Sequence, residues 1–291
     1  MQHLITTNDF TNDEINNLFE NTTLFNDLQA SSVLDGKLVI TLFFENSTRT
    51  RSSFEIAAKR LGAKVVNLDV STSSSSKGET LFDTVANLNA MKPDAIIIRH
   101  RDCGLPASLI EYVDCPIINA GDGINSHPTQ ALLDLFTIIK HFNGNYQNKK
   151  IAIIGDIKSS RVASSNLKLL PRFEIEPILV APEHFMPKSS AKKVQFLKEV
   201  IDDIDIIMSL RTQIERHNQN YYNSLEEYGK DYCVTPEIVG NRDILIMHPG
   251  PVNRNIDISD ELLIDKRSKV LEQVTNGVAV RMAILKKLIL Q

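Results

Sequence analysis

The chain has 291 residues, of which 42% are hydrophobic and 23% are charged, and its formal net charge is -4. This length accommodates two domains of ordinary size, and this composition is typical of a soluble globular protein. The weakly acidic balance argues against a general affinity for nucleic acid, and no apolar run approaches the roughly 20 residues that span a bilayer. The N-terminus lacks the basic and apolar regions of a secretory signal, so we expect no membrane association and a cytoplasmic location.

The chain contains three cysteines, Cys103, Cys115 and Cys233, and no CxxC spacing. An odd number without paired spacing predicts reduced thiols rather than a disulfide framework or a metal site.

Short, nearly continuous apolar runs recur along the chain, and helical patterns separate most of them. Such runs are typical of strands that are buried on both faces of a parallel sheet. Four precede residue 127 and four follow residue 150: 38–43, 65–70, 95–98, 116–119, 151–154, 178–181, 204–208 and 244–247. The alternation of strands and helices predicts an α/β fold.

A helix-like segment at 128–141 connects the two halves of the chain, and a polar stretch at 143–150 follows it. A second amphipathic pattern at 276–290 predicts a C-terminal helix. We therefore expect two domains, each a parallel sheet flanked by helices, joined by the linking helix and the C-terminal helix. The first comprises residues 1–140, with the C-terminal helix 276–291 packed back on it, and the second comprises residues 141–275.

Ligands of open α/β sheets bind at the carboxyl ends of the strands, and most of the predicted strands are followed there by cationic or hydrogen-bonding groups. The first strand leads into a Ser-Thr-Arg-Thr sequence at the start of a helix. Hydroxyls, backbone N–H groups and a guanidinium suit a phosphate, although Ser and Thr are also ordinary helix caps. Five cations follow strands in this way: Arg49, Lys77, Arg99, Arg161 and Arg211. An acidic chain that gathers cations at one edge is expected to bind a polyanionic small molecule.

Three further segments stand at the ends of strands or at the start of the linking helix: residues 127–130 (HPTQ), 211–213 (RTQ) and 248–251 (HPGP). Each alone is typical of a cap, a solvated side chain or a rigid turn. The serine-rich stretch at 71–76 alone suggests a flexible linker. The strand-like run before it and the helix start after it argue against a linker. The coincidence of these segments favours a ligand site.

Read in order, the segments FENSTRTR at 44–51, SSSSKGE at 73–79, HPTQ followed by ALLDL, Arg211-x-Gln213 and HPGPVNR resemble the aspartate branch of the carbamoyltransferase family. The resemblance extends over the whole chain. The STRT and HPTQ segments are shared by the wider family, whereas the Ser-Lys loop and the Arg-x-Gln segment are more specific to the aspartate branch.

The resemblance implies an enzyme that transfers the carbamoyl group of carbamoyl phosphate to L-aspartate, giving N-carbamoyl-L-aspartate and phosphate in de novo pyrimidine biosynthesis. It implies no metal and no organic cofactor. By matching position, the carbamoyl phosphate site comprises Ser47, Thr48, Arg49, Thr50, Arg99, His127, Gln130, Pro249 and Gly250, and the aspartate site comprises Lys77, Arg161, Arg211 and Gln213. The expected catalytic residues among these are Arg49, Thr50, Lys77, Arg99 and His127.

The resemblance also implies roles within these sites. Thr50, Arg99 and His127 face the carbonyl oxygen, whereas Gln130 and the Pro249 carbonyl face the carbamoyl amide. Ser73 and Lys77 reach in from the neighbouring subunit of a homotrimer. The trimer leaves room for a regulatory or dihydroorotase partner. Either the leaving phosphate or Lys77 accepts the proton of the amine. Closure of the two domains would pair Glu45 with Arg161 and Arg216.

Three alternatives remain open at this point. An ornithine carbamoyltransferase carries HCLP where this chain has HPGP, and cationic ornithine fits poorly against Arg161 and Arg211. A dinucleotide-binding protein is suggested by IAIIGD at 151–156, but the following turn has one glycine where GxGxxG has three. A catalytically inactive homologue is disfavoured because the candidate positions carry competent residues.

Two departures from the family, Gly250 in HPGP instead of HPLP and Val162 where other members have Thr, are expected to alter aspartate affinity.

Overall fold

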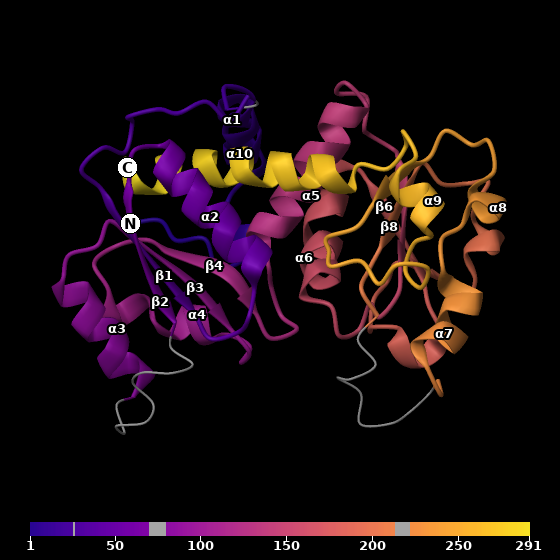
Figure 1. Ribbon diagram of the computed structural model, residues 1–291, viewed down its shortest axis with the longest axis horizontal. Coiled ribbons are helices and arrows are strands. Elements are labelled where there is room, and N and C mark those ends of the chain that lie inside the picture. Colours follow the sequence, from indigo (N-terminus) through magenta and orange to yellow (C-terminus); the bar gives the residue numbers. More distant parts are fainter. Residues whose placement is uncertain (26, 70–79, 213–221) are drawn as a thin grey trace. The chain divides into compact units, whose positions relative to one another are not determined.

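The computed structural model describes residues 1–25, 27–69, 80–212 and 222–291 (Figure 1). These residues form two compact units. Unit 1 comprises Met1–Phe136 together with Val274–Gln291, and unit 2 comprises Thr137–Gln273. Each unit contains a parallel sheet with helices beside it, so the predicted α/β fold class is confirmed.

The sheet of unit 1 has four strands in the order β2-β1-β3-β4, and all of its pairings are parallel. Its strands are β1 (Leu38–Phe43), β2 (Lys64–Asp69), β3 (Ala95–His100) and β4 (Ile117–Asp122). Each overlaps an apolar run in the sequence. Strands β1, β3 and β4 are buried at nearly every position, as strands covered on both faces are, whereas β2 is an edge strand on which Val66 is exposed. The carboxyl ends of all four strands therefore lie along one edge.

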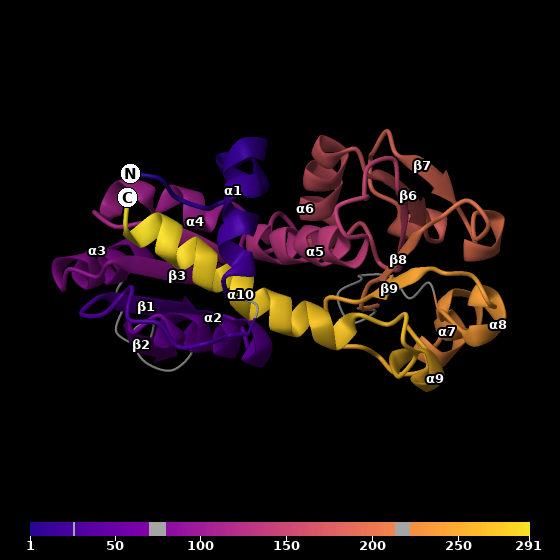
Figure 2. The ribbon, with the colours of Figure 1, turned by 90° about the horizontal axis from the view of Figure 1, so that it is seen from above.

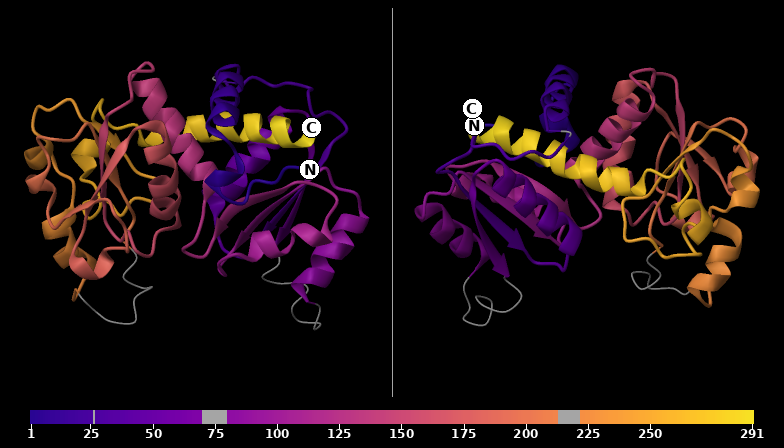
Figure 3. Two further views of the ribbon diagram at one scale, coloured as in Figure 1. Left: turned by 180° about the vertical axis from the view of Figure 1, so that it is seen from behind. Right: turned by 45° about the horizontal axis from the view of Figure 1, so that its top comes forward.

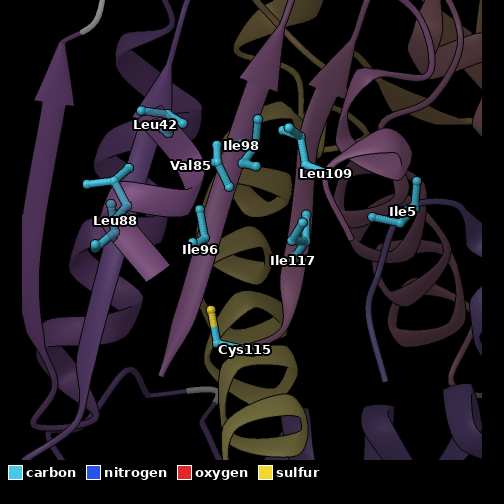
Figure 4. Packing of buried hydrophobic residues seen from close by; sticks show 10 residues of the cluster. Ile5, Leu42, Val85, Leu88, Ile96, Ile98, Leu109, Cys115 and Ile117 are labelled. Atoms are coloured by element: carbon cyan, nitrogen blue, oxygen red, sulfur yellow. The ribbon is translucent and has the colours of Figure 1, made fainter. Parts of the chain in front are cut away.

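One face of this sheet packs against α3 (Leu81–Ala90) and α4 (Leu105–Ser108) (Figure 4). Helix α3 begins at a capping box in which the Thr80 side chain accepts from the Asp83 N–H and the Asp83 carboxylate accepts from the Thr80 N–H. Its buried residues Val85 and Leu88 belong to the same core cluster as Ile96 of β3.

The opposite face is covered by α2 (Thr48–Arg60) and by the second half of α10 (Val270–Ile289) (Figures 1 and 2). Helix α2 turns Phe54, Ala57 and Ala58 inward, and the two alanines let its backbone approach the sheet closely. Unit 1 is completed by α1 (Asn12–Thr23), the first part of α5 (Pro128–His141) and the short helices η1 (Thr7–Asp9) and η3 (Ile110–Tyr112).

The first and last residues of the chain lie side by side in unit 1 (Figures 1 and 3). The Gln291 side-chain amide donates to the Gln2 side-chain oxygen at 2.7 Å. Unit 2 is thus an insertion between two parts of the chain that together build unit 1.

The sheet of unit 2 has five parallel strands in the order β7-β6-β5-β8-β9. They are β5 (Lys150–Ile154), β6 (Glu176–Val180), β7 (Lys192–Val194), β8 (Ile206–Ser209) and β9 (Leu245–Met247). The sequence predicted four strands here, and β7 is the addition. It is a short edge strand with two exposed lysines, so it lacks the apolar run of a central strand.

The helices of unit 2 are α6 (Arg161–Leu169), η4 (Leu170–Phe173), η5 (Glu183–Phe185), η6 (Leu197–Glu199), α7 (Leu225–Tyr232), α8 (Pro236–Val239) and α9 (Asp260–Leu263). The linking helix has the predicted bounds, whereas α10 begins six residues before the predicted start at 276. Among the described helices, none is long and apolar enough to cross a membrane.

Candidate functional site

The first candidate segment of unit 1 connects β1 to α2. Ser47 occupies the N-cap position of α2, yet its side chain makes no capping hydrogen bond. Thr11 and Thr80, at the same position of α1 and α3, both cap their helices. The start of α2 thus carries Ser47, Thr48, Arg49 and Thr50. Because the Ser47 side chain does not cap the helix, its first backbone N–H groups are left to another acceptor, as an anion site requires.

Arg99, at the end of β3, joins the ends of the neighbouring strands. Its carbonyl accepts from the Phe44 N–H at 3.0 Å, and its Nε donates to Glu45 at 3.1 Å. Its Nη1 donates to the Ala120 carbonyl of β4 at 3.2 Å. The Arg99 side chain is 15% exposed, so this cation is held at the strand ends in a partly desolvated position. The expected pairing of Glu45 with Arg161 stays a prediction, and Arg216 lies outside the described residues.

The turn from β4 to α5 is organised by Asp122, which is fully buried. One carboxylate oxygen accepts from the Asn119 side chain at 2.7 Å and from the Ser126 N–H at 3.1 Å. The other accepts from the Gly104 N–H at 2.7 Å and from the Asn125 side chain at 2.9 Å. This carboxylate therefore fixes the turn that ends one residue before His127. The sequence did not reveal the role, because Asp between two glycines is typical of an ordinary turn.

His127 and Gln130 lie at the start of α5, and both are buried. The His127 carbonyl accepts from the Gln130 N–H at 3.0 Å and so begins the helix. The Gln130 side-chain nitrogen donates to Asp134, one turn further on, at 2.9 Å. Both candidate side chains are thus carried by the first turn of a buried helix.

Arg281 of α10 is a buried cation that contacts both α2 and α5, the helices that follow the candidate segments of unit 1. It donates to the hydroxyl of Ser53 in α2 at 3.0 Å and to that of Thr129 in α5 at 3.5 Å. Its guanidinium lies 5.0 Å from the centre of the Phe54 ring. Burial lowers the pKa of Arg281 to about 10, although the negative charge of Asp134 opposes that shift. The sequence signal for this residue is a single arginine within an otherwise apolar stretch at 278–285.

In unit 2, Arg161 is the first residue of α6 and is 7% exposed. Ser160 caps this helix by accepting from the Ala163 N–H at 3.2 Å. The chain reaches Ser160 from β5 through Gly155, whose φ is +126° and where a Cβ would lie 3.0 Å from the Leu210 carbonyl. Glycine is therefore required for β5 to lead into this turn and place Arg161 at the strand ends.

Asp257 joins the segments that follow β8 and β9, and it is buried. Its carboxylate accepts from the Thr212 N–H at 3.2 Å and from the Asn253 N–H at 2.8 Å, and it lies 3.3 Å from His248 Nε2. His248 Nδ1 accepts from the Gly250 N–H at 2.8 Å, so Nε2 carries the proton that Asp257 accepts. Asp257 therefore fixes the backbone next to Arg211 and around Pro249, and the sequence analysis did not identify it.

The predicted site residues divide between the units. Unit 1 holds Ser47, Thr48, Arg49, Thr50, Arg99, His127 and Gln130, and unit 2 holds Arg161, Arg211, Pro249 and Gly250. Ser73, Lys77 and Gln213 lie outside the described residues. Within the described ranges, no three His, Cys, Asp or Glu side chains are grouped as a metal site requires.

Two family models cover nearly the whole chain. Residues 2–140 match the carbamoyl-P binding domain of the aspartate/ornithine carbamoyltransferases, and residues 147–288 match their Asp/Orn binding domain. Two similar relatives are the aspartate carbamoyltransferase catalytic subunits of Aliarcobacter butzleri and Campylobacter lari. They are 67% and 63% identical over 291 residues, with all of this chain and 99% and 100% of theirs covered.

Solved structures agree with this relationship. The catalytic subunit of M. jannaschii aspartate transcarbamoylase is 38% identical, with a TM-score of 0.89 over 99% of this chain and 98% of that one. The Trypanosoma cruzi enzyme in complex with N-(phosphonacetyl)-L-aspartic acid is 32% identical, with a TM-score of 0.90 over 99% of this chain and 95% of that one.

Proposed function

This chain belongs to the aspartate/ornithine carbamoyltransferase family, and we propose that it transfers the carbamoyl group of carbamoyl phosphate to the amine of L-aspartate. The products are N-carbamoyl-L-aspartate and phosphate, and the reaction serves pyrimidine biosynthesis. The observation that carries the proposal is the start of α2, where Ser47 does not cap its own helix and Arg49 is exposed.

In this proposal unit 1 binds carbamoyl phosphate. Ser47, Thr48, Arg49 and Thr50 hold the phosphate with the helix N-terminus, whose partial positive charge favours an anion. Thr50, Arg99 and His127 donate to the carbonyl oxygen, where negative charge grows as the amine attacks. Donors held in place before the reaction stabilise that charge without reorganisation. Gln130 and the Pro249 carbonyl, with Gly250 beside it, accept from the carbamoyl amide.

Unit 2 binds aspartate. Arg161 and Arg211 pair with its two carboxylates and Gln213 adds a polar contact, which orients the amine for attack. The same two cations disfavour ornithine, whose side chain is positively charged. The acceptor named for the similar relatives, aspartate, supports this choice.

The proposal includes a cytoplasmic homotrimer in which Ser73 and Lys77 of one subunit serve the site of its neighbour. Lys77 or the leaving phosphate takes the proton of the amine. The trimer also offers surfaces to a regulatory or dihydroorotase partner. Sedimentation of the purified chain tests the trimer: a monomer at the concentration of the activity assay contradicts it.

The activity is tested by phosphate release from carbamoyl phosphate with L-aspartate or L-ornithine as the only acceptor. We expect release with aspartate alone. Arg49→Ala is expected to lower kcat by about 10²-fold or more, because it removes a cation from the departing phosphate. Arg101→Ala is the matched control, since this arginine is 81% exposed and pairs only with its neighbour Asp102 among the described residues.

Each result decides one part of the proposal. Release with ornithine alone contradicts the acceptor assignment. Equal activity of Arg49→Ala and Arg101→Ala contradicts the phosphate site. Arg211→Ala should raise KM for aspartate by at least about tenfold and leave KM for carbamoyl phosphate nearly unchanged, as the loss of a clamp on one substrate requires.

A further inference from the structure

We infer that Asp134 is a positioning residue that fixes the orientation of the Gln130 amide and thereby selects a carbamoyl group. The inference rests on the proposed role of Gln130 in binding the carbamoyl amide. Asp134 itself is fully buried and does not face the substrate in this assignment; it acts through Gln130.

A glutamine side chain ends in two different groups, an oxygen that accepts and a nitrogen that donates. The carbamoyl nitrogen of the substrate carries only donors, so Gln130 is useful to it only when the amide oxygen faces the substrate. A reversed amide would set a donor against a donor. The orientation of this one group therefore decides whether the subsite accepts an NH₂ group.

The structure fixes that orientation through a single hydrogen bond. The Gln130 nitrogen donates to the Asp134 carboxylate at 2.9 Å, four residues along the same face of α5. A carboxylate has only acceptors, so it cannot pair with the amide oxygen. Within the described part of the chain, no group donates to the Gln130 oxygen. That oxygen remains available as an acceptor.

Arg281 stabilises the pairing of Gln130 with Asp134. It is 4% exposed, it attracts Asp134 electrostatically, and it binds the Thr129 hydroxyl beside Gln130 at 3.5 Å. A buried negative charge needs such a cation nearby. Gly277 leaves the space that the guanidinium occupies, because a Cβ there would lie 2.7 Å from Arg281 Nη1.

The test compares two phosphates that differ in one group. Acetyl phosphate has a methyl group where carbamoyl phosphate has NH₂, so it has no donor for Gln130. Asp134→Asn offers its own NH₂ and lets the Gln130 amide turn over. We expect this variant to raise KM for carbamoyl phosphate by about 10-fold or more. The inhibition constant of acetyl phosphate should change by less than about threefold. An equal weakening of both ligands indicates general disruption and overturns the inference.

Gln130→Ala separates this inference from the proposed site. It should cause a similar loss of preference for carbamoyl phosphate, and Asp134→Asn should add little in that background. No loss in Gln130→Ala overturns both the role of Gln130 and the inference. Loss in Gln130→Ala without loss in Asp134→Asn overturns the inference alone. If Asp134→Asn does not fold, Asp134→Asn with Arg281→Met removes both buried charges and is expected to show the same loss of preference.

Discussion

Replacement of Asp122 by asparagine tests whether one carboxylate sets the turn before His127. Each carboxylate oxygen accepts two hydrogen bonds in the structure, so the amide of asparagine keeps two and sets an NH₂ group against the other two donors. A hydrogen bond to a charged group contributes about 1.5 kcal/mol or more. The expected loss in the free energy of unfolding is therefore about 3 kcal/mol.

Scanning calorimetry measures this loss, and for units of this size about 3 kcal/mol corresponds to a fall in Tm of roughly 6–12 °C. We also expect kcat to fall at least about tenfold, because the turn places His127. Asp114→Asn is the matched control: Asp114 is exposed, and its change should stay within about 0.5 kcal/mol. Equal Tm values for the two variants would refute the reasoning.

Three further predictions concern Glu14, Asp257 and Gly277. The Thr11 N–H, the Gln2 amide and Lys287 lower the pKa of Glu14 to about 2, so its contribution is complete above pH 4.5 and is lost as the pH falls toward 2. Glu14→Gln, at a site about one third exposed, should cost about 1 kcal/mol at pH 7, and this cost should shrink as the pH falls toward 2 and vanish below it. Calorimetric melting of both forms from pH 7 downward measures this, and a difference that grows on acidification contradicts the assignment. Asp257→Asn should raise KM for aspartate at least about fivefold, measured by steady-state kinetics, and lower the free energy of unfolding by about 2 kcal/mol, measured by urea unfolding. The control Asp243→Asn, on the exposed surface, should change neither quantity. Gly277→Ala should lower stability by about 1 kcal/mol despite the better helix propensity of alanine, because its Cβ meets a buried guanidinium and Leu133; a higher Tm would show that Arg281 moves aside at no cost.

The sequence predicted the parts of the fold that burial dictates. Eight strands were visible as apolar runs, and the runs are most nearly continuous in the central strands, which are covered on both faces. Strand β7 was not, since an edge strand with exposed lysines looks like a loop. Helix α10 was predicted too short because its first two turns mix polar residues with exposed apolar ones, Leu271 and Val274, so the regular apolar pattern begins later.

The candidate site divides in the same way. The residues proposed to touch substrate could be named from the sequence because cations and hydroxyls follow strands in recognisable segments, and their roles stay predictions. The residues that hold them were missed, because their partners are distant in sequence. Arg281 and Ser53 are 228 positions apart, and Asp257 reaches back 45 positions to Thr212. Nothing in the local sequence distinguishes such a residue from an ordinary buried or turn residue.

The insertion of unit 2 between two parts of unit 1 has a consequence for synthesis on the ribosome. Residues 137–273 of unit 2 form one continuous segment, whereas unit 1 needs residues 274–291 for its core. Val280 and Ile284 are buried there together with Arg281. The early part of the chain therefore emerges first yet completes its packing last. Until α10 is released from the exit tunnel, the apolar residues of α2 and α5 that it covers remain available to chaperones.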